Sequence, residues 1–160
     1  MTIAPALAPL NRLAGSWTID LTHPALPGVV VRGTAVVEWL EGERFLIHRA
    51  RIDHPDFPDS ISIIGIIGRD RDENPLELHP TDGTESPLRM HYFDSRGVFR
   101  VYEVRMDDEG WRVWRDAAGF SQRFTGTFAD GDETIEGRWQ LCEDNMNWND
   151  DLQITYRRRK

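Results

Sequence analysis

The chain has 160 residues, and its 27 acidic side chains outnumber its 19 lysines and arginines, which gives a formal net charge of −8 at pH 7. This balance argues against nucleic acid or an anionic membrane as a partner, because both are bound by clustered Lys and Arg, whereas the basic residues here are interleaved with Asp and Glu. The length suits a single domain over residues 1–160 with a sizeable core, and the single cysteine, Cys142, excludes an internal disulfide.

The first thirteen residues predict neither a targeting signal nor a membrane span. They have no basic region and no uninterrupted apolar stretch, and no segment of the chain approaches the ~20 apolar residues that a span requires. We therefore expect a cytoplasmic protein. Pro5 and Pro9 disfavour a long helix, but residues 8–13 can form a short helical turn that plugs an open end of the fold.

From residue 15 onward, apolar and polar side chains alternate at every second position, which is the pattern of half-buried β-strands. Turn sequences such as Asp108-Glu109-Gly110 and Asp130-Gly131-Asp132 separate most of these runs. Consecutive hairpins of this kind build an up-and-down antiparallel meander. Strands are predicted over 15–22, 29–40, 44–53, 60–69, 75–80, 88–94, 98–106, 111–116, 120–129, 134–142 and 151–159; about ten of them should pair, and the pattern is weakest over 75–80.

The length of this meander predicts the architecture. An open antiparallel sheet of ten strands would leave two exposed edges, and closure into a barrel removes both. The sequence therefore predicts an all-β fold, a single antiparallel up-and-down β-barrel of about ten strands with a short N-terminal helical turn. A two-sheet sandwich is the alternative.

Alternation also assigns the inward face of each strand, because residues two apart point the same way. Small residues recur on this face, for example Ala50 and Gly65, and they leave space that larger neighbours must fill or that stays open. An apolar pocket with a few converging polar groups is the usual form of a small-molecule site. The polar side chains predicted to point inward are those of His48, Arg100, Arg115, Gln122 and Arg158.

Aromatic side chains on the inward face either pack a core or line a pocket for a flat or apolar ligand, and both interpretations stay open. Six tryptophans are a high number for this length, and three tyrosines also fall on the inward face. If the interior is a pocket, the residues predicted to bind its ligand are Trp39, His48, Tyr92, Tyr102, Arg115, Gln122 and Trp139.

His48 is the one candidate catalytic residue. Its neighbours on the same face are apolar, so its imidazole is expected inside the fold, where a group that titrates near neutrality can transfer protons. Acting as a general base, it could work beside Arg115 or Arg100, either of which would hold an anionic substrate. A core histidine with satisfied hydrogen bonds is the commoner case and remains the alternative.

The histidines do not predict a metal site. His48 and His54 lie six residues apart on one extended run, about 20 Å, which is far beyond the reach of two ligands of one zinc ion. His23, His54 and His79 each precede a proline, which indicates loops or turns, and His91 falls on a polar face. No metal is expected.

Gly15-Ser16-Trp17 opens the first predicted strand and is followed by the ten-strand meander and an Arg-rich last strand. This combination resembles the calycin superfamily, which contains the lipocalins, the fatty-acid-binding proteins and nitrobindin-like barrels. In lipocalins the Trp of such a motif packs at the closed end of the barrel against an Arg from near the final strand. The resemblance implies these roles for Trp17 and for Arg158 or Arg157.

The second half of the chain resembles a bacterial family of uncharacterised lipocalin-like proteins in the same superfamily. This family carries no established activity, so the resemblance implies a fold and no reaction. The segments that carry it are Tyr92-Phe93-Asp94-Ser95-Arg96-Gly97, Trp114-Arg115-Asp116, Phe120-Ser121-Gln122-Arg123-Phe124 and Thr134-Ile135-Glu136-Gly137-Arg138-Trp139.

Differences from the better-known relatives narrow the choice of ligand. Nitrobindin-type haem proteins open with Gly-x-Trp-x-Gly-x-Gly and bind iron through a late His, but here Thr18-Ile19-Asp20 follows Trp17 and no His follows His91, so haem is not expected. Secreted lipocalins carry a signal peptide and disulfides. Fatty-acid-binding proteins clamp a carboxylate with an Arg-x-Tyr pair on the last strand, whereas the order here is Tyr156-Arg157-Arg158.

The sequence thus favours a barrel that binds a small, largely apolar or aromatic molecule inside. One alternative is an enzyme, an isomerase, cyclase or hydrolase of a hydrophobic metabolite, that uses His48 with an Arg in the same cavity. Another is a non-binding barrel that acts through a protein partner or as a homodimer. A fully packed interior would favour this last alternative.

Overall fold

The computed structural model describes residues 3–56, 59–69 and 88–160. The predicted strand 75–80 and His79 lie outside the described residues. Among the described residues, the elements are a 3₁₀ helix η1 (Pro5–Leu13) and ten strands, β1 (Gly15–Thr22), β2 (Val31–Trp39), β3 (Phe45–Asp53), β4 (Ile61–Arg69), β5 (Leu88–Asp94), β6 (Phe99–Asp107), β7 (Gly110–Arg115), β8 (Ser121–Ala129), β9 (Thr134–Cys142) and β10 (Asn149–Arg158).

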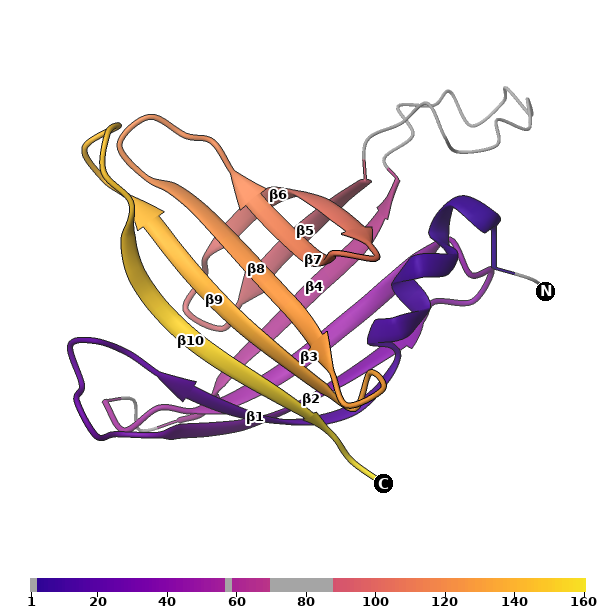
Figure 1. Cartoon of the computed structure of the whole chain (residues 1–160), viewed down its shortest axis with the longest axis horizontal. Coiled ribbons are helices and arrows are strands. Elements are labelled where there is room, and N and C mark those ends of the chain that lie inside the picture. The colour runs from indigo at the N-terminus through magenta and orange to yellow at the C-terminus, as the bar shows by residue number, and fades with distance from the viewer. Residues whose placement is uncertain (1–2, 57–58, 70–87) are drawn as a thin grey trace.

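The ten strands form one closed antiparallel barrel (Figure 1). Each strand pairs with its neighbours in the chain, and β1 pairs with β10 to complete the ring, for example through Ile19 opposite Tyr156. The predicted all-β, up-and-down barrel is confirmed, and the alternative of a two-sheet sandwich is wrong. Among the described helices, none has the length and apolar character needed to cross a membrane.

The predicted inward faces are largely buried, because burial alternates with a period of two along most strands. In β8, for example, Phe124 and Gly126 are buried between exposed neighbours. Several boundaries differ from the prediction by one or two residues, and β2, for example, begins at Val31 rather than at residue 29. The amide of Val29 instead donates to the carbonyl of Leu26 in the β1–β2 connection, which leaves Val29 38% exposed.

Helix η1 plugs one end of the barrel, as the N-terminal segment predicts, but it spans nine residues rather than one short turn. Its buried face consists of Leu7, Leu10 and Leu13, and this apolar contact offsets the break that Pro9 makes in its hydrogen bonds. Figure 1 shows η1 at the end of the barrel opposite the β1–β2 and β9–β10 connections. That opposite end is therefore the one left open.

Arg158 fixes this closed end. Its guanidinium lies 4.2 Å from the ring centre of Trp17, so the two residues that the resemblance pairs are in contact. It also donates to the carbonyl oxygens of Ala14, Arg12 and Asp132 at 2.6, 3.0 and 3.1 Å. One arginine thus joins β1, β10, η1 and the β8–β9 turn.

The same arginine explains why the first strand opens with glycine. Gly15 has a φ of +134°, and a Cβ at this position would lie 2.5 Å from Nη1 of Arg158. Any other residue would displace the guanidinium or strain the backbone. The indole of Trp17 in turn donates from Nε1 to the carbonyl of Leu13 at 2.9 Å, which ties the strand to the helix.

Replacing Arg158 by Met should lower the free energy of unfolding by about 2–4 kcal/mol, because three carbonyl groups lose a charged donor. Arg157→Met is the matched control. Arg157 points outward and pairs with Asp20 at 2.7 Å on the exposed surface, so its loss should cost less than about 1 kcal/mol. Urea denaturation of both variants measures the difference. Equal losses would show that Arg158 does not hold the closed end.

Candidate functional site

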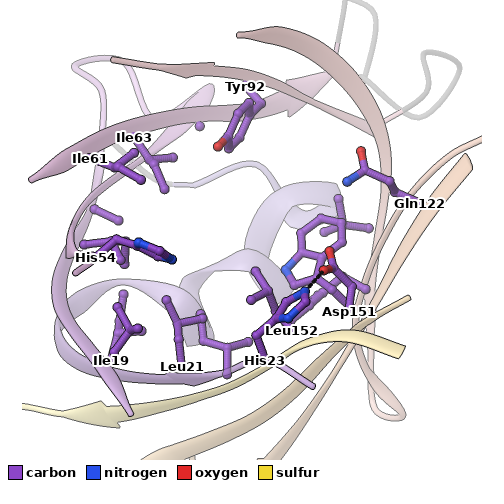
Figure 2. Close-up of a pocket in the computed structure, with 18 of the residues that line it drawn as sticks. Ile19, Leu21, His23, His54, Ile61, Ile63, Tyr92, Gln122, Asp151 and Leu152 are labelled. Carbon is purple, nitrogen blue, oxygen red and sulfur yellow. Dashed lines mark hydrogen bonds and ion pairs between the residues drawn. The ribbon is translucent and has the colours of Figure 1, made fainter. Parts of the chain in front are cut away.

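The open end of the barrel leads into a cavity of about 670 Å³. Side chains from strands all around the ring line it, and Figure 2 shows several of them, among them Ile19, Tyr92 and Gln122, arranged around a central space. A single small molecule of drug-like size needs about 300–1,000 Å³. The space inside this barrel is therefore of the right size for one such ligand.

Five of the seven residues predicted to bind a ligand line this cavity, and two lie elsewhere. The five are His48, Tyr92, Tyr102, Gln122 and Trp139.

The other two, Trp39 and Arg115, are not among the described lining residues. Trp39 ends β2 beside η1, where its Nε1 donates to Oδ1 of Asn11 at 3.0 Å. Arg115 ends β7, and its Nη1 donates to the carbonyl of Phe120 at 3.1 Å. The first residue thus joins β2 to the helix, and the second braces the β7–β8 connection.

Three rings form the floor of the cavity. His48 on β3, Trp111 on β7 and Tyr156 on β10 have ring centres 6.1 to 6.4 Å apart, so they span the barrel from side to side. Trp17 packs edge-on against Tyr156 at 6.2 Å and joins this floor to the helix-capped end. The floor separates the open cavity from the core beneath it.

The floor is polar in composition but carries no charge at neutral pH. His48 is only 9% exposed, and burial lowers its pKa from 6.5 to about 4. Burial likewise raises the pKa of the Tyr156 phenol. Its hydroxyl lies 3.5 Å from Nε2 of His48, at the limit of a hydrogen bond.

From the floor, a continuous aromatic wall runs along β5 to β9. Neighbouring rings in the series Trp111, Phe124, Trp139, Tyr102 and Tyr92 have centres 4.9 to 6.1 Å apart. Most of these contacts are edge-to-face, the arrangement that aromatic pairs prefer. This side of the cavity therefore presents ring edges and faces to a ligand.

The opposite wall, from β10 through β1 to β4, is aliphatic. Its side chains are Ile19, Leu21, Ala50, Ile52, Ile61, Ile63, Leu152 and Ile154.

A polar group interrupts the aromatic wall toward the open end. Gln122 is 8% exposed, and its Oε1 accepts from the hydroxyl of Tyr102 at 2.9 Å and from Nη1 of Arg100 at 3.3 Å. Burial raises the pKa of Tyr102, an effect that Arg100 opposes. Arg100 also lies 5.0 Å from the ring centre of Phe120.

A second polar group on this wall consists of Tyr92, Asp94 and Arg96, which are hydrogen-bonded to one another. The Tyr92 hydroxyl donates to Oδ2 of Asp94 at 2.8 Å, and Nη2 of Arg96 donates to the same oxygen at 2.7 Å. Burial alone would raise the pKa of Asp94, but these hydrogen bonds outweigh it and lower that pKa. Burial and the bond to Asp94 raise the pKa of Tyr92. The charge of Arg96 is thus already neutralised.

Two histidines stand at the mouth. His23 Nε2 lies 2.9 Å from Oδ1 of Asp151, and its Nδ1 accepts from the amide of Ala25 at 2.9 Å (Figure 2). Both ring nitrogens are therefore engaged in hydrogen bonds, and His23 links the end of β1 to Asp151 on β10. His54 lines the mouth as well, and its Nδ1 accepts from the amide of Asp56 at 3.1 Å.

The described residues contain no group of three or more His, Cys, Asp or Glu side chains that could hold a metal ion.

The sequence did not single out Arg96, His23 or Asp151 as lining residues. His23 and His54 each precede a proline, which predicts loops, and each indeed lies directly after a strand, β1 and β3 respectively. Their position in loops is a signal that they could line the cavity, since the loops at one end of a barrel surround its mouth. The sequence alone does not show which loops share an end with the cavity.

No family model matches this chain, and no curated protein matches it. Solved structures do match. The crystal structure of Rv2717c from M. tuberculosis aligns with a TM-score of 0.64 over 99% of this chain and 100% of that one, at 14% sequence identity. At that identity the similarity extends to the fold alone.

The buried His48 should make stability depend on pH. The unfolded chain binds a proton near pH 6.5 and the folded protein only near pH 4, so the unfolded state holds more protons between these values. The free energy of unfolding should fall as the pH decreases through this window, by about 2 kcal/mol between pH 7.5 and pH 5 for this group. Urea unfolding of the wild type and His48→Leu at both pH values tests this. The same loss in both proteins would contradict the assignment.

Proposed function

We propose that this protein is a calycin-like barrel that binds a small, largely apolar or aromatic molecule in its interior. The observation that carries the proposal is the cavity of about 670 Å³ with an aromatic wall facing an aliphatic one. The ten-strand closure, the Gly15 approach to Arg158 and the Trp17–Arg158 contact support the calycin-like assignment.

The alternatives have less support from the same cavity. A non-binding barrel would have a packed interior, and this one is open. The enzyme alternative uses His48 as a general base, but a pKa of about 4 makes His48 weakly basic, and both nitrogens of His23 are engaged. The geometry therefore favours binding over turnover.

Native mass spectrometry beside the denatured spectrum is the direct test, because a retained organic mass identifies a ligand class. An absorption spectrum taken on the same sample would reveal haem. For protein free of ligand, the neutral fluorophore N-phenyl-1-naphthylamine serves as a probe of the cavity.

Ile63→Asp should weaken binding of N-phenyl-1-naphthylamine by about tenfold or more, because it puts a carboxylate where the ligand would desolvate it. Ile63 lines the cavity, whereas its neighbour Ile64 points outward and is 41% exposed. Ile64→Asp is therefore the matched control and should change the dissociation constant by less than about twofold. Circular dichroism checks that both variants fold. Equal effects, or no binding to the wild type, would overturn the proposal.

A further inference from the structure

Arg100 is a cation without a carboxylate partner in the wall of an otherwise mostly apolar cavity. The structure gives its side chain one hydrogen bond, to the neutral Oε1 of Gln122 at 3.3 Å, and one ring contact, with Phe120. Among the described residues it makes no ion pair, which distinguishes it from Arg96 in the same wall. A half-buried charge of this kind is costly unless something of opposite charge completes the site.

Gln122 supplies a second group of free donors beside it. A guanidinium can only donate, so the amide oxygen of Gln122 must be the atom that faces Arg100 and Tyr102. The amide nitrogen then points away from them, and it donates to no described residue. Figure 2 shows this side chain, which is 8% exposed, reaching into the cavity.

The unused groups at this point of the wall are therefore mostly donors. They are the remaining N–H groups of Arg100 and the NH₂ of Gln122, while the Tyr102 hydroxyl donates its hydrogen to Gln122 and keeps only the acceptor capacity of its oxygen. Donors that converge on one spot need an acceptor, and a guanidinium among them favours an anion. A carboxylate matches the planar donor set of arginine.

The surrounding charges limit that anion to a single negative charge. Asp56 and Asp151 also line the cavity, and Arg96 is neutralised by Asp94. Among the arginines in the described lining, only Arg100 has a charge that remains to be matched, and further negative charge on a ligand would face the two carboxylates of the mouth. A monoanion fits this balance better than a phosphate with two charges.

We propose that the ligand is an amphiphilic carboxylic acid whose carboxylate accepts hydrogen bonds from Arg100 and Gln122 near the mouth, while its apolar body lies between the two walls and points toward the His48 floor. This proposal rests on the proposed binding function and adds the chemical class and the orientation of the ligand. The two residues that would hold the carboxylate, Arg100 and Gln122, lie on β6 and β8. They do not lie on the last strand, where the order Tyr156-Arg157-Arg158 departs from the Arg-x-Tyr pair of fatty-acid-binding proteins.

The test compares 11-(dansylamino)undecanoic acid with its methyl ester, which has the same body and no charge. The wild type should bind the acid more tightly than the ester by about tenfold or more, because a hydrogen bond to a charged group typically contributes this much to affinity. Arg100→Met should abolish this preference by weakening the acid and leaving the ester within about twofold. Arg105→Met on the same strand is the matched control, because Arg105 is exposed and pairs with Asp107 at 2.7 Å. It should keep the preference of the wild type.

Gln122→Glu provides a second variant that keeps the size of the side chain. The new carboxylate would pair with Arg100 and repel the acid, so the acid should weaken by about tenfold or more while the ester is retained. Equal affinity of the wild type for acid and ester would overturn this inference but leave the binding function intact. An equal loss of both probes in Arg100→Met would overturn it as well. Failure of the wild type to bind either probe would overturn the proposed function itself.

Discussion

Ten strands closed on themselves enclose a wider interior than the eight-stranded barrels that side chains alone can fill, so the axis of this barrel has to be occupied or left open. At one end it is occupied by the leucines of η1 and by Trp17, and Arg158 holds these parts together through three carbonyl groups and the indole ring. That arrangement requires the absence of a side chain at Gly15. Because the plug ends at the ring floor, the space beyond it remains as a cavity.

The sequence predicted which way side chains point far better than how deep they lie. A period of two assigns each residue to a face, and most of the predicted inward residues are indeed buried. The same period carries no information on position along the barrel axis, which depends on the tilt and stagger of the strands. Trp39 and Gln122 were therefore both predicted as ligand-binding, although one lies beside the helix and the other in the cavity wall.

The polar contacts of the site could not be predicted for a related reason. His23 and Asp151 are 128 residues apart and meet only because β1 and β10 close the ring. The sequence placed both Arg100 and Arg115 on inward faces of neighbouring strands and named Arg115, not Arg100, as ligand-binding, whereas Arg100 is the one that lines the cavity. Their difference arises in the β7–β8 connection, where the carbonyl of Phe120 engages Arg115 and the ring of Phe120 packs near Arg100.

A net charge of −8 might be expected to disfavour a negatively charged ligand, but distance decides which charges matter. Surface charges are screened within about 8 Å at physiological ionic strength, whereas a guanidinium in a largely apolar wall acts in a lower dielectric. The floor contributes no opposing charge, because burial keeps His48 neutral well below pH 7. The charged side chains that line the cavity therefore lie toward its mouth, and its base is uncharged. This asymmetry would orient a ligand that is itself polar at one end and apolar along the rest.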